Sequence, residues 1–579
     1  KEINASSSLN SVLGAGILLP DKPAVSDLYA YRNDSYSASI NQLYKLDKDR
    51  TLSFNVNYLY DQEKQNATDE SRYLLDDGTR YVIQESNQAL VGQHFVGGHV
   101  AYKLNSSKSY LKNNLSVNAS FPKNEGLVND FVAQTLSGHS FLLSNVLKAN
   151  YKKKNGGVAD LEWKASFADK RGVLNMSETK MSQLLRQRNF QSEATGSLLA
   201  FTIPHLMFNL NGKVMFDWQR VSAGLNSLSD ASGSEQKTWL LGAFVSPKIL
   251  LHFGNRLQWL VYVPVGVKYY HSADGSLDYD KRFFSTCPYS NLTYKPTGRL
   301  SFDLTTICEE SMPSVLSQMV LKHYVNYRTT MSNPHQVEIA PNRSVKLAFT
   351  SSYKDIIKML FGGVTLSYVD ARNGNSMGYQ VVDDVVNYIV QPQSTKNRVW
   401  QIEQTVSKGF FRWNSKISES LSIGTSRSEY YVGGDCHDGR SDYLQAKISY
   451  VASVRKWLNL SISNDYSVSK PYTDGKASGD VYRTFMNASS FTFWLGKQLN
   501  VVPSVQYYHN NYFSSGRNNV FLNTVMEYYW GNATLSLKCT NLLDRRTFHR
   551  IIDNGITRYS GEYQLRGRTI LFGIRIKII

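Results

Sequence analysis

Apolar and polar side chains alternate along most of this chain, in segments of about ten residues that polar turns and loops separate. In the stretch 51–60 the even positions are apolar, in 111–121 the odd ones are apart from Asn113, and 570–578 repeats the pattern. Successive strand side chains point to opposite faces, so each segment has one apolar and one polar face. About ten residues is the length that a tilted strand needs to cross a bilayer.

A soluble β-sandwich or propeller also has alternating strands. The number and length of the segments favour a membrane barrel, because more than twenty of them occur and soluble strands typically have about five or six residues. The sequence has no repeat of fixed period, which argues against a propeller. The pattern predicts an all-β fold over residues 1–579, a transmembrane antiparallel β-barrel of about 22 to 24 strands with short periplasmic turns and long extracellular loops.

Short and long connections alternate along the chain, as this topology requires. An opening strand is expected near residues 9–18, and an even number of strands then places both chain ends in the periplasm. The short turns are predicted at 46–49, 105–108, 152–157, 250–255, 295–298, 454–456 and 530–532. The long extracellular loops are predicted at 61–91, 169–189, 309–333, 370–397 and 545–561.

Composition supports this interpretation. The chain has no run of 18 apolar residues, which excludes transmembrane helices. Its 37 Tyr, 26 Phe and 9 Trp suit aromatic belts at the two bilayer interfaces. The formal charge of +17 comes from Lys and Arg scattered through turns and loops. No motif organises them for nucleic acid, so we expect outer-membrane lipids and lipopolysaccharide as the counterpart.

Candidate chemistry is sparse. Cys436, His437 and Asp438 are adjacent, but neighbouring loop residues do not converge on one ion, and a solvated loop tip is the expectation. The eleven His stand singly without HExxH spacing, and the four Cys form no CxxC pair. We therefore predict no catalytic residue, cofactor or metal, and no enzyme.

One disulfide is possible. Cys287 and Cys308 flank the short turn at 295–298, and a hairpin about that turn brings Thr306 opposite Cys287. A small register offset then places both sulfurs at the outer rim, where a bond needs Cα atoms within about 7 Å. The cell envelope permits oxidation. The alternative is two unpaired cysteines on separate faces.

Several stretches resemble the barrel of TonB-dependent outer-membrane transporters, specifically the Bacteroidota-type outer-membrane β-barrel family with a carboxypeptidase-regulatory-like front domain. These are "LLPDKPAVSDLYAYRNDSYSASINQLYKLDKDRTLSFNVNYLYDQEKQ", "SSYKDIIKMLFGGVTLSYVDARNGN", and the closing "TNLLD" and "LRGR" phrases. The resemblance implies uptake of a scarce nutrient across the outer membrane of a Gram-negative bacterium. It also implies surface lipoproteins as partners, and a plug domain moved by the TonB system.

The plug domain of that family is not seen in this chain, because the barrel pattern begins almost at Lys1. We expect either a plug that precedes Lys1 in the full gene product, with the TonB system as partner, or another protein in the pore. The alternative function is a plugless barrel that acts as a scaffold subunit of an outer-membrane complex with surface lipoproteins. A passive porin is a third interpretation, although porins usually have fewer strands.

Overall fold

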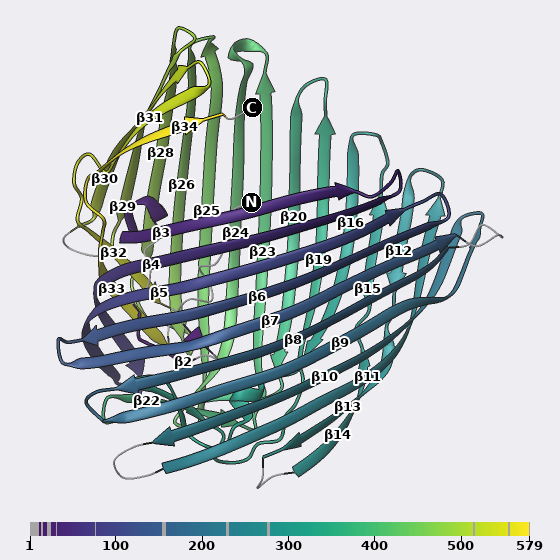
Figure 1. Ribbon diagram of the computed structural model, residues 1–579, viewed down its shortest axis with the longest axis vertical. Coiled ribbons are helices and arrows are strands. Elements are labelled where there is room, and N and C mark those ends of the chain that lie inside the picture. Colours follow the sequence, from purple (N-terminus) through teal and green to yellow (C-terminus); the bar gives the residue numbers. More distant parts are fainter. Residues whose placement is uncertain are drawn as a thin grey trace.

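The computed structural model describes residues 11–12, 15–19, 25–30, 32–75, 77–152, 158–226, 231–274, 278–512, 516–553 and 556–577. One antiparallel sheet closes into a wide barrel, with strands β3 to β9 on the near wall and β23 to β26 on the far wall in Figure 1. Among the described residues, no helix is long and apolar enough to cross a membrane. The predicted all-β barrel is confirmed.

The described wall contains twenty-three strands when β12 with β13, and β14 with β15, are each counted as one bent strand, which lies within the predicted range of 22 to 24. The wall strands are β3 (Arg32–Lys45), β4 (Arg50–Leu74), β5 (Arg80–Asn105), β6 (Ser109–Val128), β7 (Val132–Lys152), β8 (Val158–Met176), β9 (Met181–Ile203), β10 (Leu206–Asn226), β11 (Ala231–Phe253), β12 (Leu257–Tyr262), β13 (Val265–Ala273), β14 (Asp278–Thr286), β15 (Tyr289–Tyr294), β16 (Leu300–Ser311), β19 (Asn342–Asp355), β20 (Leu360–Asn373), β23 (Thr395–Phe410), β24 (Ser415–Val432), β25 (Asp435–Arg455), β26 (Leu458–Thr473), β28 (Tyr482–Leu495), β29 (Leu499–Asn510), β30 (Asn518–Trp530), β31 (Ala533–Thr540) and β34 (Thr569–Ile576).

The remaining elements lie in the connections and at the start of the chain. They are β1 (Ser11–Val12), β2 (Ala15–Gly16), α1 (Asp27–Ala30), η1 (Val315–Gln318), β17 (His323–Asn326), β18 (Thr329–Ser332), β21 (Ser376–Val382), β22 (Val385–Gln391), η2 (Arg412–Asn414), β27 (Lys476–Ala477), β32 (Thr547–Asp553) and β33 (Thr557–Gln564).

An apolar belt surrounds the wall near the short-turn end. Leu115 and Val117 of β6 are exposed, whereas the side chain of Ser116 between them is partly covered, as the alternation predicts. Polar side chains pair on the opposite face, for example Gln445 with Asp465 at 3.2 Å. Lipid therefore meets the apolar face, and the polar face lines the lumen.

The long connections differ from the prediction. Two of the five segments expected as loops, 61–91 and 169–189, continue the wall as paired hairpins: β4 and β5 pair as far as Leu74 with Arg80, and β8 and β9 as far as Met176 with Met181. Two antiparallel strands satisfy each other's backbone groups and need no lipid on either face. Polar composition therefore marks where the wall leaves the membrane and does not mark where strands end.

The opening strand predicted near residues 9–18 is wrong for the part of it that the structure describes. Its residues form the two-residue strands β1 and β2, and Ile17 packs against Ala89 and Val91 of β5. Further along, Tyr29 of α1 is buried and stacks on Phe521 at 4.2 Å between ring centroids. This part of the chain lies inside the barrel because its apolar residues are covered by luminal faces of the wall.

Among the described strands, the first and last parts of the barrel wall pair with each other only on the long-loop side. β33 pairs with β4 on the long-loop side, whereas β3 pairs only with β4, and β34 only with β31, among the described strands. Both β3 and β34 run toward the short-turn end, so the described wall has an odd number of strands and not the predicted even number. An antiparallel ladder cannot join two strands of the same direction, so closure at this height requires a strand of opposite direction between them.

Candidate functional site

The connection at residues 312–341, between β16 and β19, folds into the barrel, and we call it the luminal crossing. Its first turn, η1, is capped by Ser314, whose side chain accepts a hydrogen bond from the backbone of Leu316. Val315 and Met319 are buried and pack against Val221 of β10. Apolar burial therefore fixes this part of the crossing to the inner wall.

Lys281 and Tyr279 of β14 hydrogen-bond the backbone of Ile339 at the end of the crossing. Three further hydrogen-bonded contacts hold the crossing to other parts of the wall. Gln183 of β9 exchanges two hydrogen bonds with the backbone of Tyr324, each 2.7 Å long. Tyr270 of β13 donates to Gln318 at 2.6 Å. The third contact, between Arg328 and the β4–β5 hairpin, carries the charge of the site.

Arg328 lies in the turn between β17 and β18 and points into the wall. Its guanidinium forms an ion pair with Glu85 of β5 at 2.9 Å, and the two side chains are 8% and 2% exposed. It also donates to the hydroxyls of Ser71 at 3.3 Å and Tyr73 at 3.4 Å. The backbone carbonyl of Arg328 accepts a hydrogen bond from Val386 at 2.7 Å.

That last contact joins the crossing to a second inward connection. Strand β18 pairs in parallel with β22, and the β21–β22 hairpin in turn meets β24. Leu74, Tyr379 and Val432 form a buried apolar cluster around this junction. The two connections, 312–341 and 374–394, thus form one folded layer inside the long-loop end of the barrel, where β22 lies in Figure 1.

The Glu85 carboxylate is the unusual group in this layer. Glu85 lies about twenty residues from the short-turn end of β5, roughly 45 Å along the barrel at a typical rise and tilt, and so beyond an apolar band of about 25 Å. Burial raises the pKa of Glu85 to about 7, and the positive charge of Arg328 opposes that rise. Docking of the crossing therefore favours the protonated form of Glu85 over the charged form.

The structure brings Cys287 and Cys308 together, through a register that differs from the expected one. Thr306 lies opposite Ser290, and the backbone of Cys308 donates to the carbonyl of Pro288 at 3.1 Å. The shift arises because the turn at residues 295–299 is wider than the four residues assumed. Both residues are free thiols in this structure, and the disulfide stays a prediction.

The residues considered for metal binding do not converge. In the β24–β25 hairpin, Cys436 is exposed, while His437 is 2.8 Å from Asp474 through its Nδ1 atom. No group of three or more His, Cys, Asp or Glu side chains in the described part of the chain is placed to hold a metal ion.

Sequence reasoning missed Glu85 and Arg328. Both lie in stretches assigned to solvated loops, 61–91 and 309–333, where charged residues are ordinary. A single sequence offers no signal that these two side chains meet. Only the pairing of the β4–β5 hairpin and the inward path of the crossing place them together.

Searches of protein-family models and of curated proteins find no match to this chain. Solved structures do resemble it. A mutant ferric enterobactin receptor of Pseudomonas aeruginosa, in complex with enterobactin, is 12% identical and has a TM-score of 0.51, over 93% of this chain and 80% of that one. The fold is that of an outer-membrane barrel. The outer-membrane transporter YddB of Escherichia coli, 9% identical, also has a TM-score of 0.51, over 95% of this chain and 76% of the other.

Proposed function

We propose that this chain forms the wall of an outer-membrane transporter that takes up a scarce nutrient in a Gram-negative bacterium. The observation that carries the proposal is a wide barrel of transporter fold whose long-loop end holds a folded, polar layer. In this orientation the short turns face the periplasm and the extended hairpins face the medium. Captured nutrient meets the luminal crossing first.

The luminal crossing offers polar groups that a captured nutrient can bind. Besides the apolar packing of Val315 and Met319, it contacts the wall through hydrogen bonds and one buried ion pair. These polar contacts can be exchanged for contacts with a polar cargo. A plug domain that precedes Lys1 would block the lumen on the periplasmic side and draw energy from the TonB system. The resemblance to the Bacteroidota-type family further supports a surface lipoprotein that delivers cargo to the long-loop end.

Uptake by intact cells tests the proposal. A strain that lacks the gene and the same strain complemented with the full-length gene are compared for accumulation of labelled iron chelates, cobalamin and oligosaccharides, with and without a protonophore. We expect one class of cargo to lose energy-dependent uptake in the deletion strain and to regain it on complementation.

If uptake of every class is unchanged, transport is wrong for this protein. Loss of several different lipoproteins from the outer membrane of the same deletion strain would then support the scaffold alternative. Both measurements use the same cells, so the two functions are compared directly.

A further inference from the structure

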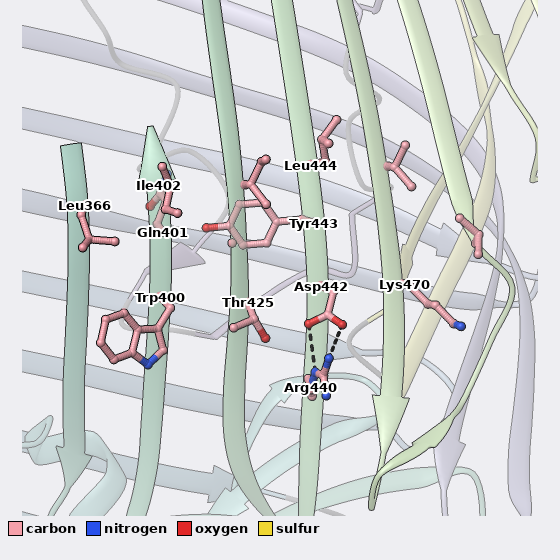
Figure 2. A pocket seen from close by; sticks show the side chains of 14 residues that line it. Leu366, Trp400, Gln401, Ile402, Thr425, Arg440, Asp442, Tyr443, Leu444 and Lys470 are labelled. Atoms are coloured by element: carbon pink, nitrogen blue, oxygen red, sulfur yellow. Dashed lines mark hydrogen bonds and ion pairs between the residues drawn. The ribbon is translucent and has the colours of Figure 1, made fainter. Parts of the chain in front are cut away.

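The outer face of five neighbouring strands, β20 and β23 to β26, carries side chains in register. Cross-strand partners form an apolar row near the middle of the wall, and these five side chains are among the fourteen that line a groove of about 600 Å³, shown in Figure 2. The row consists of Leu366, Ile402, Ile423, Leu444 and Val468. Such a groove on the membrane face fits hydrocarbon chains.

Two residues further toward the loops, the same strands present a mixed row. Tyr368 and Trp400 lie with ring centroids 4.3 Å apart, and Thr425, Asp442 and Lys470 continue the row. Aromatic rings beside charged groups mark the level where a barrel passes from hydrocarbon to head groups.

The third row is cationic, and we call it the basic row. Arg398, Arg427 and Arg440 are direct cross-strand partners, with Asp370 at one end and Tyr472 at the other. Arg398 lies 3.4 Å from Asp370, and Arg440 donates to Asp442 of the row below at 2.9 Å through its Nε atom. With Lys470, four cations face two carboxylates, and no ion pair of Arg427 is found among the described residues.

These rows face outward. Leu366, Trp400, Ile402 and Ile423 are among the exposed large apolar side chains, and the intervening residues of the same strands carry luminal polar contacts, such as Gln401 to Glu403 at 2.6 Å. Figure 2 shows Trp400, Thr425, Asp442 and Lys470 on four successive strands, β23 to β26, with the opposite wall behind them.

The height of the basic row fits the outer head groups. Arg440 lies about fifteen residues from the short-turn end of β25, roughly 35 Å along the barrel at a typical rise and tilt. The hydrocarbon core is about 30 Å thick, and the bilayer with its head groups is about 40 to 45 Å thick. Neighbouring strands are about 4.8 Å apart, so a phosphate can contact two adjacent arginines at once.

We propose that this surface binds a phosphorylated glycolipid of the outer leaflet, with acyl chains in the apolar groove and a phosphate on Arg398 and Arg427. Charge complementarity favours this occupant, because apolar, aromatic and cationic rows follow the same order as acyl chain, interface and phosphate. One row further toward the loops, Arg343, Arg372 and Lys396 are aligned in the same way and add positive charge. Glu429, whose carboxylate accepts a hydrogen bond from the backbone of Lys396, and its partner Asp438 continue that row with negative charge, so the phosphate is assigned to Arg398 and Arg427. The inference rests on the outer-membrane location proposed above and is independent of transport.

Native mass spectrometry of the purified full chain in detergent tests this site with two probes: diphosphorylated lipid A and the same lipid after dephosphorylation. We expect tighter binding of the phosphorylated lipid. The double variant Arg398→Gln and Arg427→Gln should bind it about fivefold more weakly per arginine removed and bind the dephosphorylated lipid unchanged.

Lys447→Gln is the matched control. It removes one cation from β25, but Lys447 is an odd-numbered position on that strand and lies on the luminal face opposite to Asp442 and Leu444. Equal binding of the two lipids by the wild type, or an equal loss in the control, would overturn the site. An acidic protein that copurifies, and that the double variant loses without any lipid dependence, would also overturn it. Uptake in the cell assay is unaffected by any of these results, so the two proposals can fail separately.

Discussion

Removing the positive charge of Arg328 should release the luminal crossing from the wall. In an Arg328→Gln variant, Glu85 stays buried among the same neighbours but loses the guanidinium 2.9 Å away. The hydrogen bonds to Ser71 and Tyr73 are lost as well. The remaining contacts, between Tyr270 and Gln318 and between Gln183 and Tyr324, hold η1 and β17 but do not replace the side-chain contacts of the β17–β18 turn.

The magnitude follows from burial of the pair. Removing one partner of a buried ion pair costs about 3 to 5 kcal/mol, because the other charge is left uncompensated. At about 1.4 kcal/mol per tenfold, the crossing should open about a hundred to several thousand times more often. The effect should be largest above pH 7, where the Glu85 carboxylate is charged, since burial raises its pKa to about 7.

Hydrogen exchange of the full chain in detergent, read by mass spectrometry, measures this opening directly. Peptides over β17, β18 and β22 should exchange faster in the variant, because β18 pairs with β22 and Val386 donates to the carbonyl of Arg328. Peptides over β28 to β31, on another part of the wall, should be unchanged. The difference should grow between pH 6 and pH 8.5 after correction for intrinsic exchange.

Arg299→Gln is the control. Arg299 also pairs with a carboxylate, Asp355 at 3.3 Å, but its side chain is 55% exposed, so its loss should cost about 1 kcal/mol or less. Unchanged exchange over β17 and β18 in Arg328→Gln, or the same change in both variants, would refute the claim that the buried pair holds the crossing.

The other predictions concern the same layer, the membrane face and the thiols. The pKa of Glu85 lies above its ordinary 4.5, so docking of the crossing should be strongest below about pH 4.5 and weaken by about 3 kcal/mol as pH rises through 7; Glu85→Gln should remove that pH dependence of exchange. Val117→Arg should destabilise the assembled barrel by about 2 to 4 kcal/mol, whereas Ser116→Arg should be tolerated. Heat-modifiable mobility on gels measures assembly, and equal damage from both variants would mean that the assignment of the two faces is wrong. Mass spectrometry of the non-reduced protein should find Cys287 linked to Cys308, and two free thiols would contradict this.

Much of the fold can be predicted from the sequence, because the alternation of apolar and polar residues is a property of each strand by itself. Alternation with a period of two, as in 51–60 and 111–121, depends only on one strand with lipid on one side and polar surroundings on the other. The barrel and the outward position of Val117 could therefore be predicted without any knowledge of neighbouring strands. The same pattern misled at 61–91 and 169–189, because a hairpin above the membrane has water on its outer face and buries many polar side chains, such as Asp69 and Gln183, on its inner face. Its composition therefore resembles that of a loop.

The sites depend on pairing between distant segments, which one sequence does not contain. Arg398, Arg427 and Arg440 stand on three different strands, and only the register of β23, β24 and β25 aligns them. Glu85 and Arg328 meet because the crossing turns inward, a choice made by burial of Met319 and its neighbours against the wall. Local periodicity determined the barrel. Contacts between segments far apart in the chain determined which charged side chains lie next to one another, because strand register and the inward path of the crossing are not local properties.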